Sequence, residues 1–296
     1  MTQRWSVSRL GDLNGKRIIV TGATNGVGLA TARSLARAGA QVILAVRNAE
    51  LGAQRAREMG GDTRVVELDL ADQRSVRAFP TLFDGDVDVL INNAGVVSQN
   101  RTETVDGFET TLGTNFLGPF ALTNLLFTRV RSQIINVGSD AHKMATFPFE
   151  DPHLRSQKWS AMPAYARSKL AVMLWGLELD RRLRAAGSPV STYLTHPGWV
   201  ASNLSNVSDG RVMKAFHTVV HSAATVLAND IDAGAAPTLY CITEPIPPGS
   251  YVGIDSRRGL KGGPTLSGRS AVACDYADAA RLWAFAEKET GTTLSV

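Results

Sequence analysis

The chain has 296 residues, of which 44% are hydrophobic and 20% are charged, and its formal net charge at pH 7 is +4. These proportions exclude an extended disordered chain and are typical of a globular protein with a substantial core, built as one large domain or two small ones. The lysines and arginines are scattered along the chain, which argues against a nucleic-acid-binding surface.

Cysteine content and hydropathy bear on the cellular compartment. Cys241 and Cys274 are too few for a disulfide framework, so we expect a reduced interior, and a single bridge between them is the alternative. The N-terminus lacks the apolar core of a signal peptide, and no later stretch approaches the roughly 20 apolar residues of a membrane span. We therefore expect a cytoplasmic protein with no integral membrane segment, for which peripheral membrane contact stays open.

Apolar runs suited to buried strands recur along the first two thirds of the chain. They lie at 17–20, 42–46, 65–68, 87–91, 133–137 and 190–194. Segments with helical periodicity lie between them, among them 29–38 and 170–184. Strands that alternate with helices imply right-handed crossovers and a mainly parallel sheet covered on both faces. The sequence therefore predicts an α/β fold, a single doubly wound Rossmann-like domain over 1–296.

The last fifth of the chain has a different pattern. The stretches EPIPPGS at 244–250 and RRGLKGGPTLSGR at 257–269 are rich in loop-forming residues, and each is too short to tether separate domains. We expect an irregular region over about 244–296 that is closed by a helix at 275–289.

The stretch TGATNGVG at 21–28 follows the first predicted strand directly. Glycines at a strand-to-helix turn permit unusual backbone angles and close approach to a ligand, while the helix N-terminal N–H groups attract a pyrophosphate. The spacing of Gly22, Gly26 and Gly28 differs from the G-x-G-x-x-G fingerprint. By itself the motif therefore fits a phosphate cradle or a plain tight turn.

Tyr165 and Lys169 are four residues apart, so on a helix they share one face. A free tyrosine has a pKa of about 10, and a nearby cation favours its phenolate and makes it usable as a base. The Y-x-x-x-K pattern needs only two residues, and an ordinary helix pair is the alternative.

Taken in order along the chain, the motifs resemble the short-chain dehydrogenase/reductase family. After the T-G-x-x-x-G-x-G loop come Asp69 in ELDL, NNAG at 92–95, Asn115 in TNFLGPF, Ser139 in NVGSD, YARSK at 165–169 and HPGWV at 196–200. The long loop before YARSK, the helix after it and the C-terminal end are similar to the branch that contains retinol dehydrogenases, protochlorophyllide reductases and WW-domain oxidoreductases. We expect the N-terminal membrane anchor and the WW domains of some relatives to be absent here.

The resemblance implies a catalytic tetrad of Asn115, Ser139, Tyr165 and Lys169. In carbonyl reduction Tyr165 would donate a proton to the developing alkoxide as hydride arrives from a nicotinamide, and oxidation would reverse both steps. Ser139 would hydrogen-bond the same oxygen. Lys169 would also hold the nicotinamide ribose, and Asn115 would support a water that links Lys169 to solvent.

The second predicted strand indicates the type of cofactor. Where NAD enzymes commonly have an acidic residue, the sequence LAVRN has Arg47, whose guanidinium can bind a 2′-phosphate bidentately. NADP(H) is therefore favoured, and a solvated strand-end arginine is the alternative. The expected cofactor-binding residues are Gly22, Thr24, Asn25, Gly26, Val27, Gly28, Arg47, Asp69, Leu70, Asn93, Ala94, Gly95, Tyr165, Lys169, Pro197 and Gly198. By resemblance to the family, Asp69 and Leu70 would lie along the adenine.

Several other motifs have simpler interpretations. NNAG would border the cofactor by resemblance, but it also fits a turn or a helix cap. His142 and His196 lack the cysteine or carboxylate neighbours of a metal site, so we expect turn or pocket-lining positions and no metal. Trp199 either covers the nicotinamide or packs against the protein, and packing is favoured.

The sequence indicates the chemical class of the substrate but does not identify the substrate itself. The resemblance implies a variable substrate lid at about 200–230, where Met213, Phe216, Val219 and Val220 would give it an apolar face; core packing of these side chains is the alternative. Together with the long loop before Tyr165, this favours a bulky apolar carbonyl or alcohol. The alternatives are a reductase of an activated C=C bond and a cofactor-sensing protein without turnover. The resemblance also suggests a homodimer formed through 100–130 and 163–186.

Overall fold

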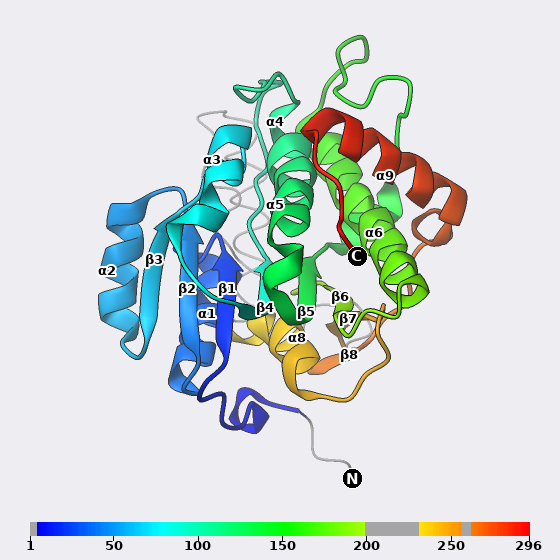
Figure 1. The fold of residues 1–296 in the computed structure, drawn as a ribbon. Coiled ribbons are helices and arrows are strands. Elements are labelled where there is room, and N and C mark those ends of the chain that lie inside the picture. The colour runs from blue at the N-terminus through cyan, green and yellow to red at the C-terminus, as the bar shows by residue number, and fades with distance from the viewer. Residues whose placement is uncertain (1–4, 199–230, 256–261) are drawn as a thin grey trace, which may run out of the picture.

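The computed structural model describes residues 5–198, 231–255 and 262–296 (Figure 1). These residues form one eight-stranded sheet in the order β3-β2-β1-β4-β5-β6-β7-β8. The strands are β1 (Arg17–Thr21), β2 (Gln41–Val46), β3 (Thr63–Glu67), β4 (Val87–Asn92), β5 (Val130–Val137), β6 (Ser191–Thr195), β7 (Tyr251–Ile254) and β8 (Pro264–Leu266). Neighbouring strands are parallel except for the antiparallel pair β7–β8. The predicted α/β fold and mainly parallel sheet are confirmed.

Helices cover both faces of this sheet (Figure 1). They are α1 (Gly26–Arg37), α2 (Ala49–Met59), α3 (Gln73–Ala78), α4 (Thr110–Leu112), α5 (Gly118–Leu126), α6 (Ala161–Ala185), α8 (Ile231–Thr243) and α9 (Tyr276–Thr290). Shorter helical turns span Val7–Arg9, Phe79–Leu82, Gly113–Leu117, Phe127–Arg129, Asp140–Met144 and Val272–Cys274. The helices α1, α2 and α8 pack on one face, and α3, α5, α6 and α9 lie on the other.

The strand sequences are continuous apolar runs because both faces of the sheet are buried. Ile18 and Val20 in β1 belong to the core layer under α1 and α8, whereas Ile19 belongs to the layer under α5 and α6. All three side chains are fully buried. The alternation of side chains along a strand thus divides one apolar run between two cores.

The six predicted strands match β1 to β6, and the predicted helices at 29–38, 170–184 and 275–289 match α1, the second part of α6 and α9. The region 244–296 is more regular than expected, because it contains β7 and β8 as well as α9. The predicted lid at about 200–230 and Trp199 lie outside the described residues.

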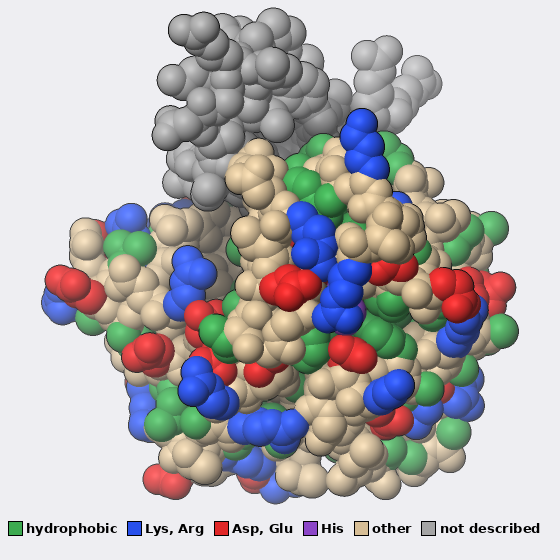
Figure 2. Space-filling model, turned by 90° about the horizontal axis from the view of Figure 1, so that it is seen from above, with side chains coloured by type: hydrophobic (Ala, Val, Ile, Leu, Met, Phe, Trp, Pro, Cys, Tyr) green, Lys and Arg blue, Asp and Glu red, His purple; other side chains and the backbone are tan. Residues whose placement is uncertain are grey.

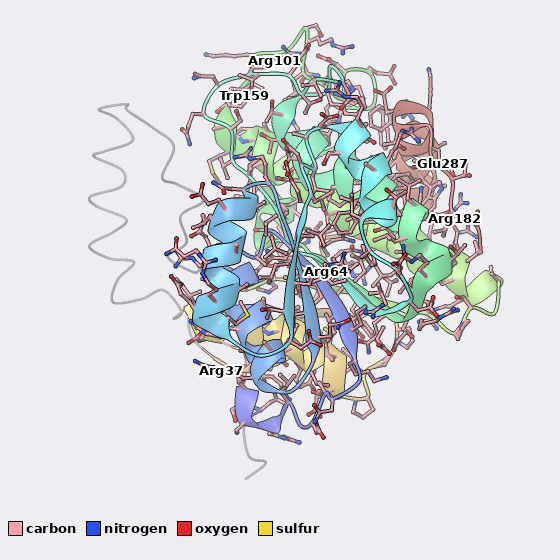
Figure 3. All side chains as sticks on the ribbon, turned by 60° about the vertical axis from the view of Figure 1, so that its left-hand side comes forward. Arg37, Arg64, Arg101, Trp159, Arg182 and Glu287 are labelled. Atoms are coloured by element: carbon pink, nitrogen blue, oxygen red, sulfur yellow. The ribbon has the colours of Figure 1, made fainter. Side chains whose placement is uncertain are left out.

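The C-terminal helix α9 lies along the outer side of α6 (Figure 1). Its Trp283 is 1% exposed, and the ring centroid lies 5.0 Å from that of Phe120 in α5. The guanidinium of Arg182 in α6, labelled in Figure 3, lies 4.3 Å from the centre of the Trp283 ring. Part of the two segments suggested for a homodimer is therefore covered by the chain's own C-terminus.

On the face seen in Figure 2, Lys and Arg side chains are interspersed with Asp and Glu. Within the ranges given above, no helix is both long enough and apolar enough to cross a membrane.

Candidate active site

The glycine loop between β1 and α1 is packed closely against the end of β4. Gly22 has φ +67°, and a Cβ atom added there would lie 2.9 Å from Cα of Ala94. A Cβ atom added at Gly28 would lie 2.3 Å from Nδ2 of Asn93 and 2.5 Å from the carbonyl oxygen of Gly22. Glycine is needed at these two positions because the loop and the NNAG segment are in direct contact.

The NNAG segment holds the glycine loop in place. The backbone N–H groups of Asn93 and Ala94 donate to Oγ1 of Thr21 at 2.9 and 3.0 Å, and Nδ2 of Asn93 donates to the Thr21 carbonyl at 2.8 Å. The Asn93 side chain is therefore engaged in supporting the loop, beside the position expected for the cofactor. NNAG is thus more than a turn or a helix cap.

Helix α1 begins at Gly26, and its N-terminus directly follows the exposed Asn25. The Asn25 side chain caps none of the first N–H groups of this helix. Thr24 and Val27 flank this point and are half-buried. The first turn therefore presents backbone donors of the kind that bind a pyrophosphate.

The end of β2 brings Arg47 beside the glycine loop. The backbone N–H of Gly22 donates to the carbonyl of Ala45 at 2.9 Å, which fixes the two chain segments side by side. Arg47 is exposed, and among the described residues its guanidinium has no hydrogen bond or ion pair. Because it is exposed and has none of these partners, the Arg47 guanidinium can bind an anionic ligand at the end of β2.

Arg55, which the sequence analysis missed, contacts the glycine loop. Nε of Arg55 in α2 donates to the carbonyl of Thr24 at 3.2 Å, and its Nη1 lies 2.7 Å from Oε2 of Glu58. The helical spacing to Glu58 could have indicated the ion pair. The contact with Thr24 depends on how α2 packs, which the sequence pattern does not show.

Asp69 and Leu70 follow the end of β3. Oδ1 of Asp69 accepts a hydrogen bond from the backbone N–H of Ala71 at 2.9 Å, and the Asp69 N–H donates to Ser75 Oγ at 2.9 Å. Leu70 is 5% exposed and belongs to the core layer under α5. The contact of these two residues with an adenine stays a prediction.

Three of the predicted site residues meet where β4 and β5 end. Nζ of Lys169 in α6 donates to the carbonyl of Val137 at 2.8 Å. A Cβ atom added at Gly95 would lie 3.4 Å from Oδ1 of Asn115 and 3.5 Å from Nζ of Lys169. Tyr165 is on the same helix as Lys169, and its ring centroid lies 5.8 Å from Lys169 Nζ. The fold thus brings together residues that are far apart in the sequence.

Asn115 is rigidly held within a π-helical turn, Gly113–Leu117. Its Oδ1 accepts from the Val96 N–H at 2.7 Å, and its Nδ2 donates to the Val96 carbonyl at 3.0 Å and to Ser168 Oγ at 2.9 Å. Ser168 in turn donates to the carbonyl of Tyr165. The Asn115 side chain thus ties the end of β4 to α6, and its support of a water stays a prediction. π turns of this kind occur frequently at functional sites.

Burial disfavours the charged forms of both Tyr165 and Lys169. Desolvation lowers the pKa of Lys169 to about 8. Burial raises the pKa of Tyr165, and the Ser139 hydroxyl has a smaller opposing effect. The sequence analysis expects Lys169 to favour the phenolate, and burial of Tyr165 acts in the opposite direction. At neutral pH the site therefore holds a protonated phenol beside an ammonium group.

Ser139 lies two residues after the end of β5 and is the N-cap of the turn Asp140–Met144. Its Oγ accepts a hydrogen bond from the Ala141 N–H at 3.2 Å, so the hydroxyl proton can be donated elsewhere. The carbonyl of Ser139 lies 2.7 Å from Nδ1 of His142, a contact that the sequence analysis did not anticipate.

The neighbouring loop after β6 carries His196, Pro197 and Gly198. His196 is 4% exposed, and its Nδ1 accepts from the Gly198 N–H at 3.2 Å. Gly198 has φ +69°, in the left-handed region that favours glycine. Across residues 5–198, 231–255 and 262–296, no group of three or more His, Cys, Asp or Glu side chains is placed to hold a metal ion.

Comparisons with known proteins show which family and relatives the chain resembles. A family model described as short chain dehydrogenase matches residues 16–211. The chain is 44% identical to human retinol dehydrogenase 12 over 205 residues, which are 65% of this chain and 64% of that protein. It is 43% identical to polyprenol dehydrogenase of Mus musculus over 206 residues, which are 64% of this chain and 61% of that protein. The matched part thus spans less than two thirds of either relative.

A solved structure is similar over nearly the whole chain. It is the crystal structure of an uncharacterized protein from Mycobacterium paratuberculosis, 40% identical with a TM-score of 0.85. The similarity covers 99% of this chain and 100% of that one.

Proposed function

The chain belongs to the short-chain dehydrogenase family, and on that premise we propose that it is an NADP(H)-dependent oxidoreductase that interconverts an alcohol and a carbonyl. The observation that carries the proposal is the meeting of Gly95, Asn115 and Lys169, with Tyr165 on the same helix as the lysine. The two relatives named above are called after apolar alcohols, retinol and polyprenol, which supports a bulky apolar substrate here.

The residues at the ends of β1 and β2 fit a dinucleotide phosphate. Gly22 and Gly28 keep side-chain atoms out of the loop, and the N-terminus of α1 offers backbone donors for the pyrophosphate. Arg47 would bind the 2′-phosphate, and Lys169 would hold the nicotinamide ribose. When bound, this cofactor supplies or accepts the hydride.

Of the four proposed catalytic residues, Tyr165 and Ser139 act on the substrate oxygen and Lys169 and Asn115 support them. Tyr165, kept protonated by burial, donates its proton to that oxygen as the carbonyl is reduced. Ser139 donates a second hydrogen bond to the same atom, since its Oγ already accepts from Ala141. The Lys169 ammonium stabilises the phenolate that the proton transfer leaves behind, and Asn115 fixes the distance between β4 and α6.

The cofactor preference can be tested by exchanging the charge at Arg47. In Arg47→Asp we expect the affinity for NADPH to fall at least about 10-fold, because a charged bidentate contact is replaced by repulsion, with little change for NADH. Dissociation constants from equilibrium titration provide the measurement. Arg57→Asp, an exposed position on α2, makes the same charge change and should leave the preference intact. An unaltered NADPH preference in Arg47→Asp would show that the 2′-phosphate assignment is wrong.

The pH dependence of carbonyl reduction should follow Lys169. Its ammonium form is present below a pKa of about 8 and is lost above it. We expect kcat/KM for the carbonyl to be level at low pH and to fall as the pH rises through about 8. In Lys169→Arg the cation persists to a higher pH, so this fall should move upward. A wild-type profile that rises over this range, or one that Lys169→Arg leaves in place, would contradict the assignment.

We extend the proposal to the organisation of the protein. A single domain over 1–296, a cytoplasmic location and a small-molecule substrate follow from the sequence and stay predictions. A homodimer is also predicted, and we propose that it uses a face other than α5 and α6, because α9 covers part of both helices.

A further inference from the structure

The His142 imidazole is fully buried and contacts the backbone of Ser139. Both the backbone N–H and Nδ1 of His142 contact the carbonyl oxygen of Ser139, at 3.1 and 2.7 Å. On the other side of the ring, Nε2 lies 3.3 Å from the backbone nitrogen of Ser270. The His142 side chain therefore spans the distance between the active-site turn and the C-terminal segment.

These partners determine the tautomer of His142. The Ser139 carbonyl can only accept, so the proton must be on Nδ1; the Ser270 N–H can only donate, so Nε2 must be unprotonated. Burial lowers the pKa of His142, while the Ser139 carbonyl and the Asp140 carboxylate have the opposite effect. The ring is therefore neutral, with both nitrogens hydrogen-bonded.

A second contact secures the same turn. The hydroxyl of Tyr251 in β7 donates to Oδ1 of Asp140 at 3.0 Å. The Tyr251 ring also packs edge-on against His142, with 5.7 Å between ring centroids. Two residues of the turn after Ser139 thus contact the C-terminal part of the chain: His142 contacts Ser270, and Asp140 contacts Tyr251.

We propose that His142 is a positioning residue, whose Nδ1–H fixes the Ser139 backbone and so directs the Ser139 hydroxyl at the substrate oxygen. This inference rests on the proposed function, in which Ser139 donates a hydrogen bond to that oxygen. Two donors on one carbonyl prevent the Ser139 peptide from rotating, and Oγ is further held by the Ala141 N–H. A hydroxyl restrained in this way loses less conformational freedom when it binds the developing alkoxide.

The test is a double-mutant cycle between His142 and Ser139 in the full-length protein. In His142→Leu, which keeps an apolar volume and removes both hydrogen bonds, we expect kcat for carbonyl reduction to fall about 10-fold or more with little change in NADPH affinity. In a Ser139→Ala background the same change should cost no more than about 2-fold. His142→Asn, which can present an N–H near the Nδ1 position, should recover most of the loss.

Matched variants distinguish positioning from simple packing. His153 is another buried histidine, 5% exposed, which bridges the Glu109 N–H and the Glu289 carboxylate. His153→Leu should lower the midpoint of thermal unfolding and leave kcat within about 2-fold of wild type. If His142→Leu does not fold, His142→Asn should exceed His142→Gln in kcat, because a glutamine amide lies nearer the Nε2 position.

The outcomes separate this inference from the proposed function. Equal losses for His142→Leu in the wild-type and Ser139→Ala backgrounds, or no advantage of asparagine over leucine or glutamine, would overturn the positioning role alone. If Ser139→Ala itself kept wild-type turnover, the role proposed for Ser139 would be wrong, and the role of His142 with it.

Discussion

Replacing Tyr165 with phenylalanine should lower kcat for carbonyl reduction at least about 100-fold and leave the dissociation constant of NADPH nearly unchanged. The change removes one hydroxyl from a half-buried ring and keeps the packing of α6. The change removes the proton that passes to the substrate oxygen, together with the hydroxyl's interaction with Ser139. Initial rates of NADPH consumption and an equilibrium titration with NADPH measure the two quantities separately.

A matched control for this experiment is Tyr193→Phe. Tyr193 is also buried, and its hydroxyl lies 3.5 Å from the carbonyl of Ile246 in the loop that precedes β7. Ile246 precedes the first residue of β7, whereas the site lies where the strands end. Turnover should therefore stay within about 2-fold of wild type. If Tyr165→Phe kept the turnover of this control, Tyr165 would not be the proton donor.

Replacing Gly28 with valine should weaken NADPH binding at least about 100-fold and lower the free energy of unfolding by about 1–3 kcal/mol. The new Cβ would lie 2.3 Å from the Asn93 amide and 2.5 Å from the Gly22 carbonyl oxygen, so the glycine loop would have to move away from β4. Titration with NADPH and denaturant unfolding measure the two losses.

The control for the glycine loop is Gly268→Ala. A Cβ atom added at Gly268 meets no atom within 4 Å, and this glycine has no positive φ. Both its NADPH affinity and its stability should remain close to wild type. Wild-type NADPH affinity in Gly28→Val would mean that the cofactor does not bind in this loop.

The main features of the fold could be predicted from the sequence because they rest on short-range patterns. Each strand from β1 to β6 is an apolar run, since helices bury both of its faces. β7 and β8 were missed because they have four and three residues and lie between stretches rich in glycine and proline. Such short segments form strands through pairing with β6 and with each other, and this pairing leaves little trace in the local sequence.

The identity of the site residues could be predicted from the motifs, but their electrostatics could not. Placing Tyr165 and Lys169 on one helical face follows from their spacing. The direction of the Tyr165 pKa depends on burial, which the Ser139 hydroxyl opposes to a smaller extent, and both effects require the folded chain. The effect of the lysine on the phenolate stays a prediction, and the folded chain adds an opposing effect of burial.

The contacts of Arg55 and His142 were missed for a related reason. Arg55 reaches the Thr24 carbonyl from the next helix, and His142 receives the N–H of Ser270 from 128 residues further along the chain. His142 was assigned a turn or pocket-lining position, and it does lie in the turn after β5. Its hydrogen bond to Ser139 spans three residues, and the sequence by itself gives no sign that the ring folds back.

The central claim is that the protein transfers hydride between NADPH and the carbonyl carbon of a bulky apolar substrate. The most direct test incubates the wild-type protein with NADPH deuterated at nicotinamide C4, using both C4 epimers in turn, and a panel of apolar aldehydes, ketones, quinones and enones. Mass spectrometry then locates the label in each product. We predict an alcohol with one deuterium on the former carbonyl carbon from one epimer and none from the other. Deuterium on a former C=C carbon, or tight NADPH binding with no labelled product from any substrate, would contradict the proposed function.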